Sequence, residues 1–525
     1  MPRGSSSEPP TSADEIELKF AVAPEALRRL RRHPLFASVP ASRRGVTSTY
    51  FDTPDLDLRR RGLALRLRKE GRHHIQTLKP CGPMSTADPR RREWRSPVAG
   101  AAPDLSRVGA DDQLAGIDGA MLQPVFTSRI RRTTWLLRLD GDARIEVACD
   151  QGAIETPDGR SLPVSELELE LKEGSVRTLF ATARALNERE PLHIETRSKA
   201  ERGYGLIAGD PDVPSWTAPR LGKIDLRRDM PVEDALSAIA RHCLRHMLAN
   251  DEAALENTAE GVHQMRVALR RLRATFSLFR PLIPEAQWRW VSGETKRIAS
   301  ALGEARNWDV LAHHLAPVER AFPGDADVAA LMRAACAKRE AAYGVMRETV
   351  ASSDYTDFAL GMMGWIETRG WRERTGAAAA ALLRAPLGDM ADELLERRHR
   401  KARKLAKGFA ELDPAGRHKL RIALKKLRYA IDAMQRIYAA KPAKRHLKRL
   451  SRLQDDLGLL NDVATTDRLL RELVDAPASS GDPRRGAALV QGWYRCILAE
   501  REAKLGKRLS RFLKVKPFWH PLGED

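Results

Sequence analysis

The sequence predicts an α+β protein of two domains: an N-terminal closed antiparallel β tunnel and a C-terminal all-α part made of duplicated helical bundles. Three observations support this prediction. Segments of alternating charged and apolar residues recur in the first part of the chain. A Pro-rich stretch without any periodicity follows them. Beyond it lie long helices rich in Ala, Leu and Arg, in which one basic motif occurs twice.

A chain of 525 residues is too long for one ordinary core, which favours two or three domains. The expected boundaries follow the changes in composition. We expect a disordered tail at 1–12, the tunnel domain at 13–208, a linker at 209–224 and the helical domain at 225–520.

The net charge of +20 is unevenly distributed. Residues 1–210 carry 34 Lys and Arg against 30 Asp and Glu, whereas the remainder carries 56 against 40. The second part therefore holds most of the positive field, which favours a polyanionic partner.

The five cysteines are scattered without a C-x-x-C pair, as expected in a reducing cytoplasm. No apolar run is long enough to span a membrane, so we expect a cytoplasmic protein without membrane contact.

The first domain is organised around strands with one charged face. The segment Glu15–Lys19 alternates strictly, and Glu166–Lys172 repeats the pattern more clearly than any other stretch. One such strand has a solvated face, but eight or so strands with Arg, Lys and Glu on the second face indicate a barrel with a polar lumen. Buried charges must be paired or must hold ligands. Guanidinium groups facing carboxylates suit a phosphate anion bound with a hard divalent cation.

These residues carry a resemblance. Glu15-x-Glu17-x-Lys19 resembles the E-x-E-x-K signature of the CYTH, or triphosphate tunnel metalloenzyme, family. Later pieces are similar to that family in the expected order, from the Tyr-Phe-Asp-Thr turn that begins at Tyr50 to the closing lysine, Lys199. The resemblance implies a β tunnel that hydrolyses a triphosphate with Mg²⁺ or Mn²⁺.

The resemblance also implies roles for individual residues. The implied metal ligands are Glu15, Glu17, Glu168 and Glu170, with Glu146 and Asp150 as second candidates. The implied phosphate-binding residues are Lys19, Arg66, Arg68, Lys79, Arg129, Arg131 and Lys199. The expected catalytic set is Glu15, Glu17, Lys79 and Glu93, where Glu93 anchors an arginine or orients water. The general base stays unassigned. Tyr50 is expected to pack, or to stack on an organic group if the substrate is thiamine triphosphate.

The second domain contains two copies of a basic motif, His263–Arg273 and His418–Arg428, which lie 155 residues apart. In each copy the basic groups at positions +0, +3, +7 and +10 fall within about 80° of arc on a helix. The intervening apolar residues form a core-facing stripe. The resulting ladder residues are His263, Arg266, Arg270, Arg273, His418, Arg421, Lys425 and Arg428.

This half resembles the CHAD family, a His-rich α-helical domain associated with inorganic polyphosphate. The resemblance implies that the ladder residues bind polyphosphate and that the protein is cytoplasmic or associated with polyphosphate granules. Nucleic acid ranks below polyphosphate as a partner, because few aromatic residues interleave with the basic positions.

The favoured hypothesis is a metal-dependent inorganic triphosphatase joined to a polyphosphate-binding domain. One alternative is a non-enzymatic polyphosphate-binding or targeting protein whose tunnel has lost its activity. Another is an adenylate cyclase or thiamine triphosphatase that uses the same tunnel. The presence of the opening glutamates, Lys19 and the arginine pairs favours activity, and no base-recognition element is visible.

Overall fold

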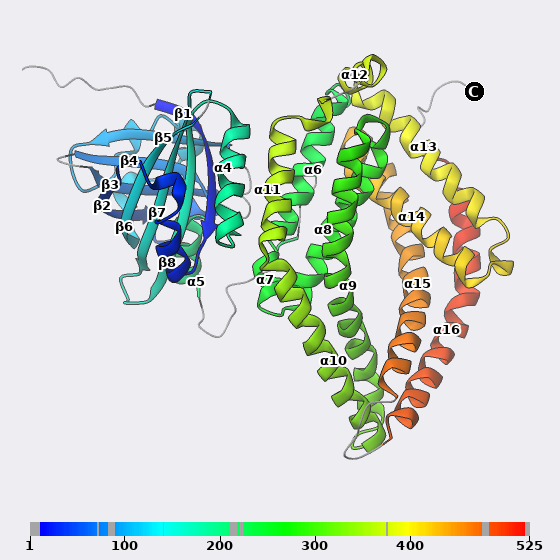
Figure 1. The fold of residues 1–525 in the computed structure, drawn as a ribbon. Coiled ribbons are helices and arrows are strands. Elements are labelled where there is room, and N and C mark those ends of the chain that lie inside the picture. The colour runs from blue at the N-terminus through cyan, green and yellow to red at the C-terminus, as the bar shows by residue number, and fades with distance from the viewer. Residues whose placement is uncertain are drawn as a thin grey trace, which may run out of the picture. The chain divides into compact units, whose positions relative to one another are not determined.

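The computed structural model describes residues 11–70, 73–81, 90–139, 141–209, 218–220, 222, 224–373, 376–474 and 482–519. Most of the expected tail at 1–12 and of the linker at 209–224 lies outside these residues, as does the side chain of Glu15. The chain forms two compact units. Residues 1–219 and 351–368 make the first, and residues 220–350 and 369–525 make the second. Figure 1 shows the strands in the first unit and the long helices in the second.

The first unit is built on a nine-stranded antiparallel sheet. Its strands are β1 (Thr11–Ala21), β2 (Ser42–Asp52), β3 (Leu63–Glu70), β4 (His73–Pro80), β5 (Arg90–Val98), β6 (Gln123–Leu139), β7 (Ala143–Glu155), β8 (Ser161–Glu173) and β9 (His193–Ile194). Their order is β5-β4-β3-β2-β6-β7-β8-β1-β9. β1 pairs with β8 through Ile16–Ala21 and also with β5 through Thr11–Ile16, so it has a neighbour from each end of the series β5 to β8.

Helices cover part of the outer face of this sheet. They are α1 (Pro24–Leu30), α2 (Asp57–Arg60), α3 (Asp111–Leu114) and α4 (Val176–Arg189), whereas α5 (Lys199–Ala208) lies at one end of the sheet. α1 and α4 pack on β8. Leu167 and Leu169 of β8 are fully buried, whereas Glu166, Glu168 and Glu170 point to the opposite side by the period of two. The covered apolar face thus directs the carboxylates of β8 inward.

α11 (Ser353–Glu367) also belongs to the first unit, although its sequence lies far from the strands. Arg184 of α4 donates two hydrogen bonds to the carboxylate of Asp357, at 2.5 and 2.9 Å. The amide of Asn187 donates to the carbonyl of Ser353 at 2.8 Å. A segment from between the two copies of the basic motif therefore completes the packing around α4.

α5 is fixed at one end of the sheet by a buried acid. The carboxylate of Asp52 accepts hydrogen bonds from the backbone N–H groups of Leu58 and Arg59 in α2 and from the hydroxyl of Tyr204 in α5, at 2.8–3.0 Å. A Cβ on Gly203 would lie 2.2 Å from the ring of Phe126, so only glycine permits this approach of α5 to β6. The Tyr-Phe-Asp-Thr motif thus serves to hold α5.

The second unit consists of helices in two copies. The first copy contains α6 (Val232–Leu248), α7 (Asp251–Leu255), α8 (Ala259–Leu278), α9 (Glu285–Ala321) and α10 (Ala326–Val350). After α12 (Ala377–Arg384), the second contains α13 (Leu387–Ala406), α14 (Pro414–Met434), α15 (Ala440–Leu473) and α16 (Pro483–Leu513). α6, α8 and α9 begin 155 residues before α13, α14 and α15, the same interval that separates the basic motifs. The predicted duplication is therefore visible in the helices.

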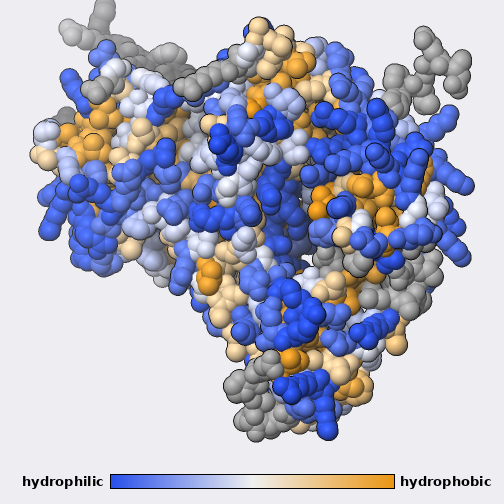
Figure 2. All heavy atoms as spheres, turned by 45° about the vertical axis from the view of Figure 1, so that its right-hand side comes forward, coloured by the Kyte–Doolittle hydropathy of each residue, from blue (hydrophilic) through white to orange (hydrophobic). Residues whose placement is uncertain are grey.

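The two copies meet at equivalent positions. Pro231 and Pro386, also 155 residues apart, form an antiparallel bridge immediately before α6 and α13. α8 packs against α14 and α9 against α15. Hydrophilic residues cover much of the face shown in Figure 2. Among the described residues, no helix is both long and apolar enough to cross a bilayer.

Candidate functional site

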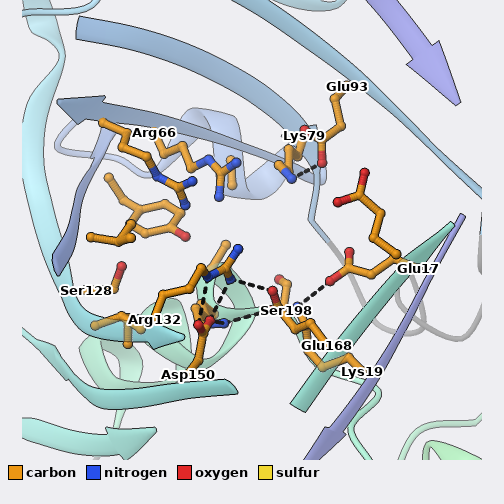
Figure 3. Close-up of a pocket in the computed structure, with 18 of the residues that line it drawn as sticks. Glu17, Lys19, Arg66, Lys79, Glu93, Ser128, Arg132, Asp150, Glu168 and Ser198 are labelled. Atoms are coloured by element: carbon orange, nitrogen blue, oxygen red, sulfur yellow. Dashed lines mark hydrogen bonds and ion pairs between the residues drawn. The ribbon is translucent and has the colours of Figure 1, made fainter. Parts of the chain in front are cut away.

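A polar cavity of about 270 Å³ lies inside the sheet of the first unit. Side chains from β1 to β8 and from α5 line it. Of the eleven predicted residues that contribute to the lining, ten lie in strands: Glu17, Lys19, Arg66, Arg68, Lys79, Glu93, Glu146, Asp150, Glu168 and Glu170. Lys199 contributes as well. In Figure 3, Arg66 and Lys79 lie across the cavity from Asp150 and Glu168. The structure therefore brings together most of the residues that the sequence indicated.

Three carboxylates form an acidic cluster, which we define as Asp150, Glu166 and Glu168. They offer oxygen atoms within 4.8 Å of one another, a spacing suited to a cation. The ammonium of Lys199, the first residue of α5, already contacts all three, at 2.9, 2.5 and 2.8 Å. Burial lowers the pKa of Lys199, but the three carboxylates outweigh it and raise that pKa well above its usual value. The acidic cluster thus holds a protein cation.

Arg132 neutralises the same cluster from β6. Its guanidinium donates to both oxygens of Asp150 at 2.7 and 2.6 Å and to Glu168 at 2.5 Å. Lys19 adds a contact to Glu168 at 3.1 Å. Burial raises the pKa of Glu168, but Lys19, Lys199 and Arg132 outweigh it and hold the pKa well below its usual value. Glu168 and Asp150 are therefore ionised and paired in this structure.

A second set, the carboxylate row, consists of Glu17, Glu146 and Glu170. Strand register places Glu17 of β1 directly opposite Glu170 of β8, and Glu170 directly opposite Glu146 of β7. Directly opposed side chains have Cβ atoms about 4.5–5.5 Å apart, and like charges there repel. Lysines lie beside the row: Lys172 contacts Glu170 at 2.6 Å and Lys19 contacts Glu17 at 3.6 Å. The row places three carboxylates on the cavity wall, and carboxylate oxygens are ligands that a hard divalent cation accepts.

The opposite wall is basic. Arg66 and Arg68 of β3 and Lys79 of β4 all line the cavity. The ammonium of Lys79 forms an ion pair with Glu93 of β5, which is buried. Glu93 therefore anchors a cation, but this cation is Lys79 and not the arginine that was expected. This wall presents guanidinium and ammonium donors to any anion in the cavity.

The predicted pair Arg129 and Arg131 does not line the cavity. Both side chains are exposed, and Arg129 binds Glu155 at 3.1 Å on the outer face of the sheet. Arg132 takes the inward position instead. The prediction chose the wrong face of β6, because Arg129, Arg131 and Arg132 place arginines on both faces and the pattern alone does not say which face is internal.

Several lining residues were missed or assigned elsewhere. Arg44 and Lys172 line the cavity but were not among the candidate residues, although Lys172 ends the clearest alternating segment of the chain. Arg95, which was not among the candidate residues, contributes to the lining as well. Tyr50 contributes too and stacks on Phe126, with ring centroids 4.4 Å apart, which agrees with a packing role.

In the second unit, some of the ladder residues face one another between α8 and α14. We define the ladder cluster as His263, Arg266, Arg270, Arg421 and Lys425. Burial, followed by Arg421 and Arg270, lowers the pKa of Lys425 to about 7, although Asp462 opposes the shift. Burial and then Arg270 and Arg306 lower the pKa of Arg266 to about 10. The cluster therefore concentrates positive charge with little compensation, as expected of an anion site.

The other ladder residues have different surroundings. Arg428 donates to the side chain of Gln454 at 2.9 Å, and His418 is exposed. Arg273 is exposed and lies near Lys426, whose pKa it lowers. Each of the two predicted ladders is thus divided in the structure, because Arg273 in one and His418 and Arg428 in the other lie outside the ladder cluster.

Comparison with known proteins supplies the family. The CYTH domain model matches residues 13–204, and the CHAD domain model matches residues 238–471. The chain joins a CYTH domain to a CHAD domain. Both resemblances proposed from the motifs are confirmed by these matches.

Individual relatives cover parts of the chain. An inorganic triphosphatase of Haemophilus influenzae is 32% identical over 204 residues, which are 38% of this chain and 57% of that protein. An uncharacterized protein of Mycobacterium tuberculosis is 26% identical over 319 residues, which are 57% of this chain and 58% of that protein. These matches thus span less than two thirds of either relative. Among solved structures, the CHAD domain of the plant Ricinus communis is 26% identical with a TM-score of 0.49, covering 57% of this chain and 97% of that chain.

The CYTH family is metal-dependent, and the residues of this CYTH domain fit a metal ion. Carboxylate oxygens are the ligands that Mg²⁺ and Mn²⁺ prefer. Lys199 and Arg132 already fill the acidic cluster, whereas the carboxylate row faces the cavity with lysines at its side. The acidic cluster has the closer oxygen atoms, and the row carries ion pairs of its own with Lys19 and Lys172.

Proposed function

We propose that the CYTH domain hydrolyses inorganic triphosphate with Mg²⁺ or Mn²⁺ inside a closed tunnel. The pairing of β1 with both β8 and β5 supports closure. The observation that carries the proposal is one cavity with a carboxylate row on one wall and Arg66, Arg68 and Lys79 on another. The similarity to an inorganic triphosphatase supports the same substrate class.

Each wall has a defined task in this proposal. Glu17, Glu146 and Glu170 hold the metal ion, which would neutralise charge on the transferred phosphoryl group. Arg66, Arg68 and Lys79 donate hydrogen bonds to phosphate oxygens and align the chain of phosphates. Lys199 and Arg132 keep Asp150 and Glu168 neutralised, so that these carboxylates do not repel the anion. Lys19 and Lys199, which were also predicted to bind phosphate, instead neutralise carboxylates of the acidic cluster, since both contact Glu168.

The test measures orthophosphate release from tripolyphosphate by the full-length protein with Mg²⁺. We expect Glu17→Ala to reduce kcat at least about 100-fold, because it removes a carboxylate from the row. Glu155→Ala removes an exposed carboxylate on the outer face and serves as the matched control. EDTA should abolish turnover by the wild-type protein. Wild-type turnover by Glu17→Ala would contradict the metal assignment.

A panel of substrates separates the related activities. Tripolyphosphate, thiamine triphosphate and ATP are offered at equal concentration, and phosphate and cyclic AMP are both measured. We expect tripolyphosphate to give the highest kcat/KM. Cyclic AMP formation would instead indicate a cyclase, and inactivity toward all three substrates would favour a targeting protein without catalysis.

We further propose that the CHAD domain binds inorganic polyphosphate through the ladder cluster. The supporting observation is that His263, Arg266 and Arg270 of one copy lie with Arg421 and Lys425 of the other, as their mutual electrostatic effects indicate. Arg270→Ala should weaken the binding of long-chain polyphosphate, whereas Arg289→Ala, an exposed cation at the start of α9, should have little effect. Equal affinities in the two variants would contradict this assignment.

A further inference from the structure

The duplication of the CHAD domain allows each site to be compared with its equivalent in the other copy. At one contact between the copies, Arg271 of α8 in the first copy forms an ion pair with Asp432 of α14 in the second at 2.5 Å. His242 and Cys243 of α6 line the same small cavity as this pair. Cys243 is almost fully buried. Arg271 at this site is therefore matched by a carboxylate, and the guanidinium of Arg245 also lies close enough to lower the pKa of His242, after burial and Arg271.

The equivalent positions in the second copy differ in charge. At an interval of 155 residues, Arg271 corresponds to Lys426 and Asp432 corresponds to Ser277. The carboxylate is thus replaced by a neutral hydroxyl. Cys243 corresponds to Arg398, which adds a guanidinium where the first copy has a thiol. The equivalent site, formed by Ser277 of α8 with Arg398 and Lys426 of the second copy, therefore lacks the counter-ion and has an additional cation.

The side chains of the second copy are arranged around this change. The guanidinium of Arg398 in α13 donates to the carbonyl and the hydroxyl of Ser277, at 3.0 and 2.8 Å. Its Nε is buried and has no hydrogen-bond partner among the described residues. Burial lowers the pKa of Lys426, and Arg398, Lys401 and Arg273 lower it further. Three helices therefore bring four cations together.

This group is distinct from the ladder cluster. Lys425 and Lys426 are consecutive in α14 and so point about 100° apart around the helix. Lys425 is influenced by Arg421, Arg270 and Arg266, whereas Lys426 is influenced by Arg398, Lys401 and Arg273. α14 thus presents a different basic face to each group.

Cations held together in a partly desolvated place without a carboxylate repel one another, and a bound anion removes that cost. Phosphate oxygens accept hydrogen bonds from both guanidinium and ammonium groups. We propose an additional site that binds a phosphate group of inorganic polyphosphate. It consists of Arg273 of α8, Arg398 and Lys401 of α13, and Lys426 of α14. This inference rests on the proposed polyphosphate binding by the CHAD domain.

The test measures the affinity of the full-length protein for long-chain polyphosphate at a series of salt concentrations. Ser277→Asp restores the carboxylate of the first copy next to Arg398, and Lys426→Ala removes one cation. We expect both variants to bind more weakly and to reduce the slope of log Kd against log salt by about 0.7 for each lost phosphate contact. Lys426→Arg keeps the charge and should bind like the wild type.

Arg400→Ala provides the matched control, because Arg400 is an exposed cation of the same helix, α13, and contacts Glu396 at 3.6 Å. The proposal is overturned if Ser277→Asp and Lys426→Ala keep the wild-type slope, or if Arg400→Ala changes it as much. A single-stranded RNA is measured in parallel, and an effect on RNA binding alone would also overturn the assignment to polyphosphate. Thermal unfolding of each variant checks that the fold is retained.

Arg270→Ala separates this inference from the proposed function. If Arg270→Ala loses binding and Lys426→Ala binds like the wild type, the ladder cluster is supported and the additional site is rejected. Absence of polyphosphate binding by the wild-type protein removes the proposed function of the CHAD domain itself.

Discussion

At the scale of single residues, the charge of a side chain matters less than the face of the strand that carries it. Arg129 and Arg132 both lie in β6, three positions apart. Arg132 is largely buried against Asp150 and Glu168, whereas Arg129 binds Glu155 at the surface. The two arginines therefore form a matched pair for measuring what an internal cation contributes.

We predict that Arg132→Ala destabilises the protein by about 3–5 kcal/mol, because it leaves two buried carboxylates without this partner. Arg129→Ala should change the free energy of unfolding by less than about 1 kcal/mol, since its ion pair is exposed. Urea denaturation of the two variants provides the comparison. Similar losses in both would mean that the inward and outward assignments are wrong.

We predict that Lys425 makes the proposed binding of polyphosphate dependent on pH. Its pKa is lowered by burial, and then by Arg421 and Arg270, to about 7 in the folded protein. The unfolded chain, with a pKa near the ordinary 10.5, binds the proton more tightly between these two values. The stability of the folded protein therefore rises with pH from about 7 to about 10.5, as far as this group is concerned.

Anion binding has the opposite dependence. Above about pH 7, Lys425 must take up a proton when polyphosphate binds, so we predict that affinity falls as the pH rises past that value. Lys425→Arg keeps its charge and should show a weaker dependence. Isothermal titration calorimetry in buffers of different ionisation enthalpy measures the proton uptake directly. Equal proton uptake by the wild type and by Lys425→Arg would exclude Lys425 as its source.

At the scale of elements, α5 has two functions that depend on one placement. Its first residue, Lys199, reaches the acidic cluster, and its Tyr204 is held by Asp52. Gly203 allows the helix to lie against Phe126. A shift of this helix would therefore move the ammonium away from the carboxylates.

We predict that Gly203→Ala destabilises the protein by about 1–3 kcal/mol, because the new methyl group overlaps the ring of Phe126. Gly205→Ala in the same helix meets nothing within 4 Å and should stabilise the protein by up to about 1 kcal/mol through helix propensity. Thermal unfolding and tripolyphosphate turnover are measured for both. Loss of stability in both variants alike would show that the contact with Phe126 is not the cause.

The elements that could be predicted from the sequence are those whose alternation persists along the strand. In β8, Glu166, Glu168 and Glu170 alternate with leucines, and the structure places all three carboxylates on the inward side. β6 is different, because its outer face changes from exposed Arg129 and Arg131 to Trp135, which is buried and stacks on Phe36 with ring centroids 4.6 Å apart. No single polar face runs the length of this strand, so its inward residues could not be identified.

Pairing within the cavity was also hidden from the sequence. Glu168 was expected to bind metal, but three cations from β1, β6 and α5 surround it. Such contacts depend on which strands are neighbours, and strand order is a property of the whole sheet. The ladder residues show the same limit. The helical period predicted that they share one face of each helix, but not that Arg270 lies near Lys425 while Arg273 lies near Lys426.

At the scale of the whole molecule, the positive charge lies mainly in the second part of the chain. Of the net charge of +20, residues 1–210 contribute +4 and the remainder +16. A polyanion bound by such a surface releases condensed counterions, and added salt opposes that release. The charge distribution thus favours binding of polyphosphate by the part that contains the CHAD domain.

We predict that the affinity for long-chain polyphosphate falls steeply with salt, by about 0.7 in log Kd per tenfold increase in salt for each phosphate contact. Tripolyphosphate turnover at saturating substrate should change much less, because salt screens the buried ion pairs of the cavity wall only weakly. Fluorescence anisotropy and phosphate release, measured over the same salt series, provide the two readouts. Parallel salt dependence of both would indicate that one surface serves both activities.

The cations that fill the acidic cluster also affect how the protein is made. Carboxylates gathered in a barrel wall would ordinarily resist folding until an ion arrived from outside. Lys199 and Arg132 are part of the polypeptide, so this charge compensation forms together with the strands. Newly synthesised chains should therefore fold without magnesium or manganese, and the proposed metal ion would bind to the already folded domain.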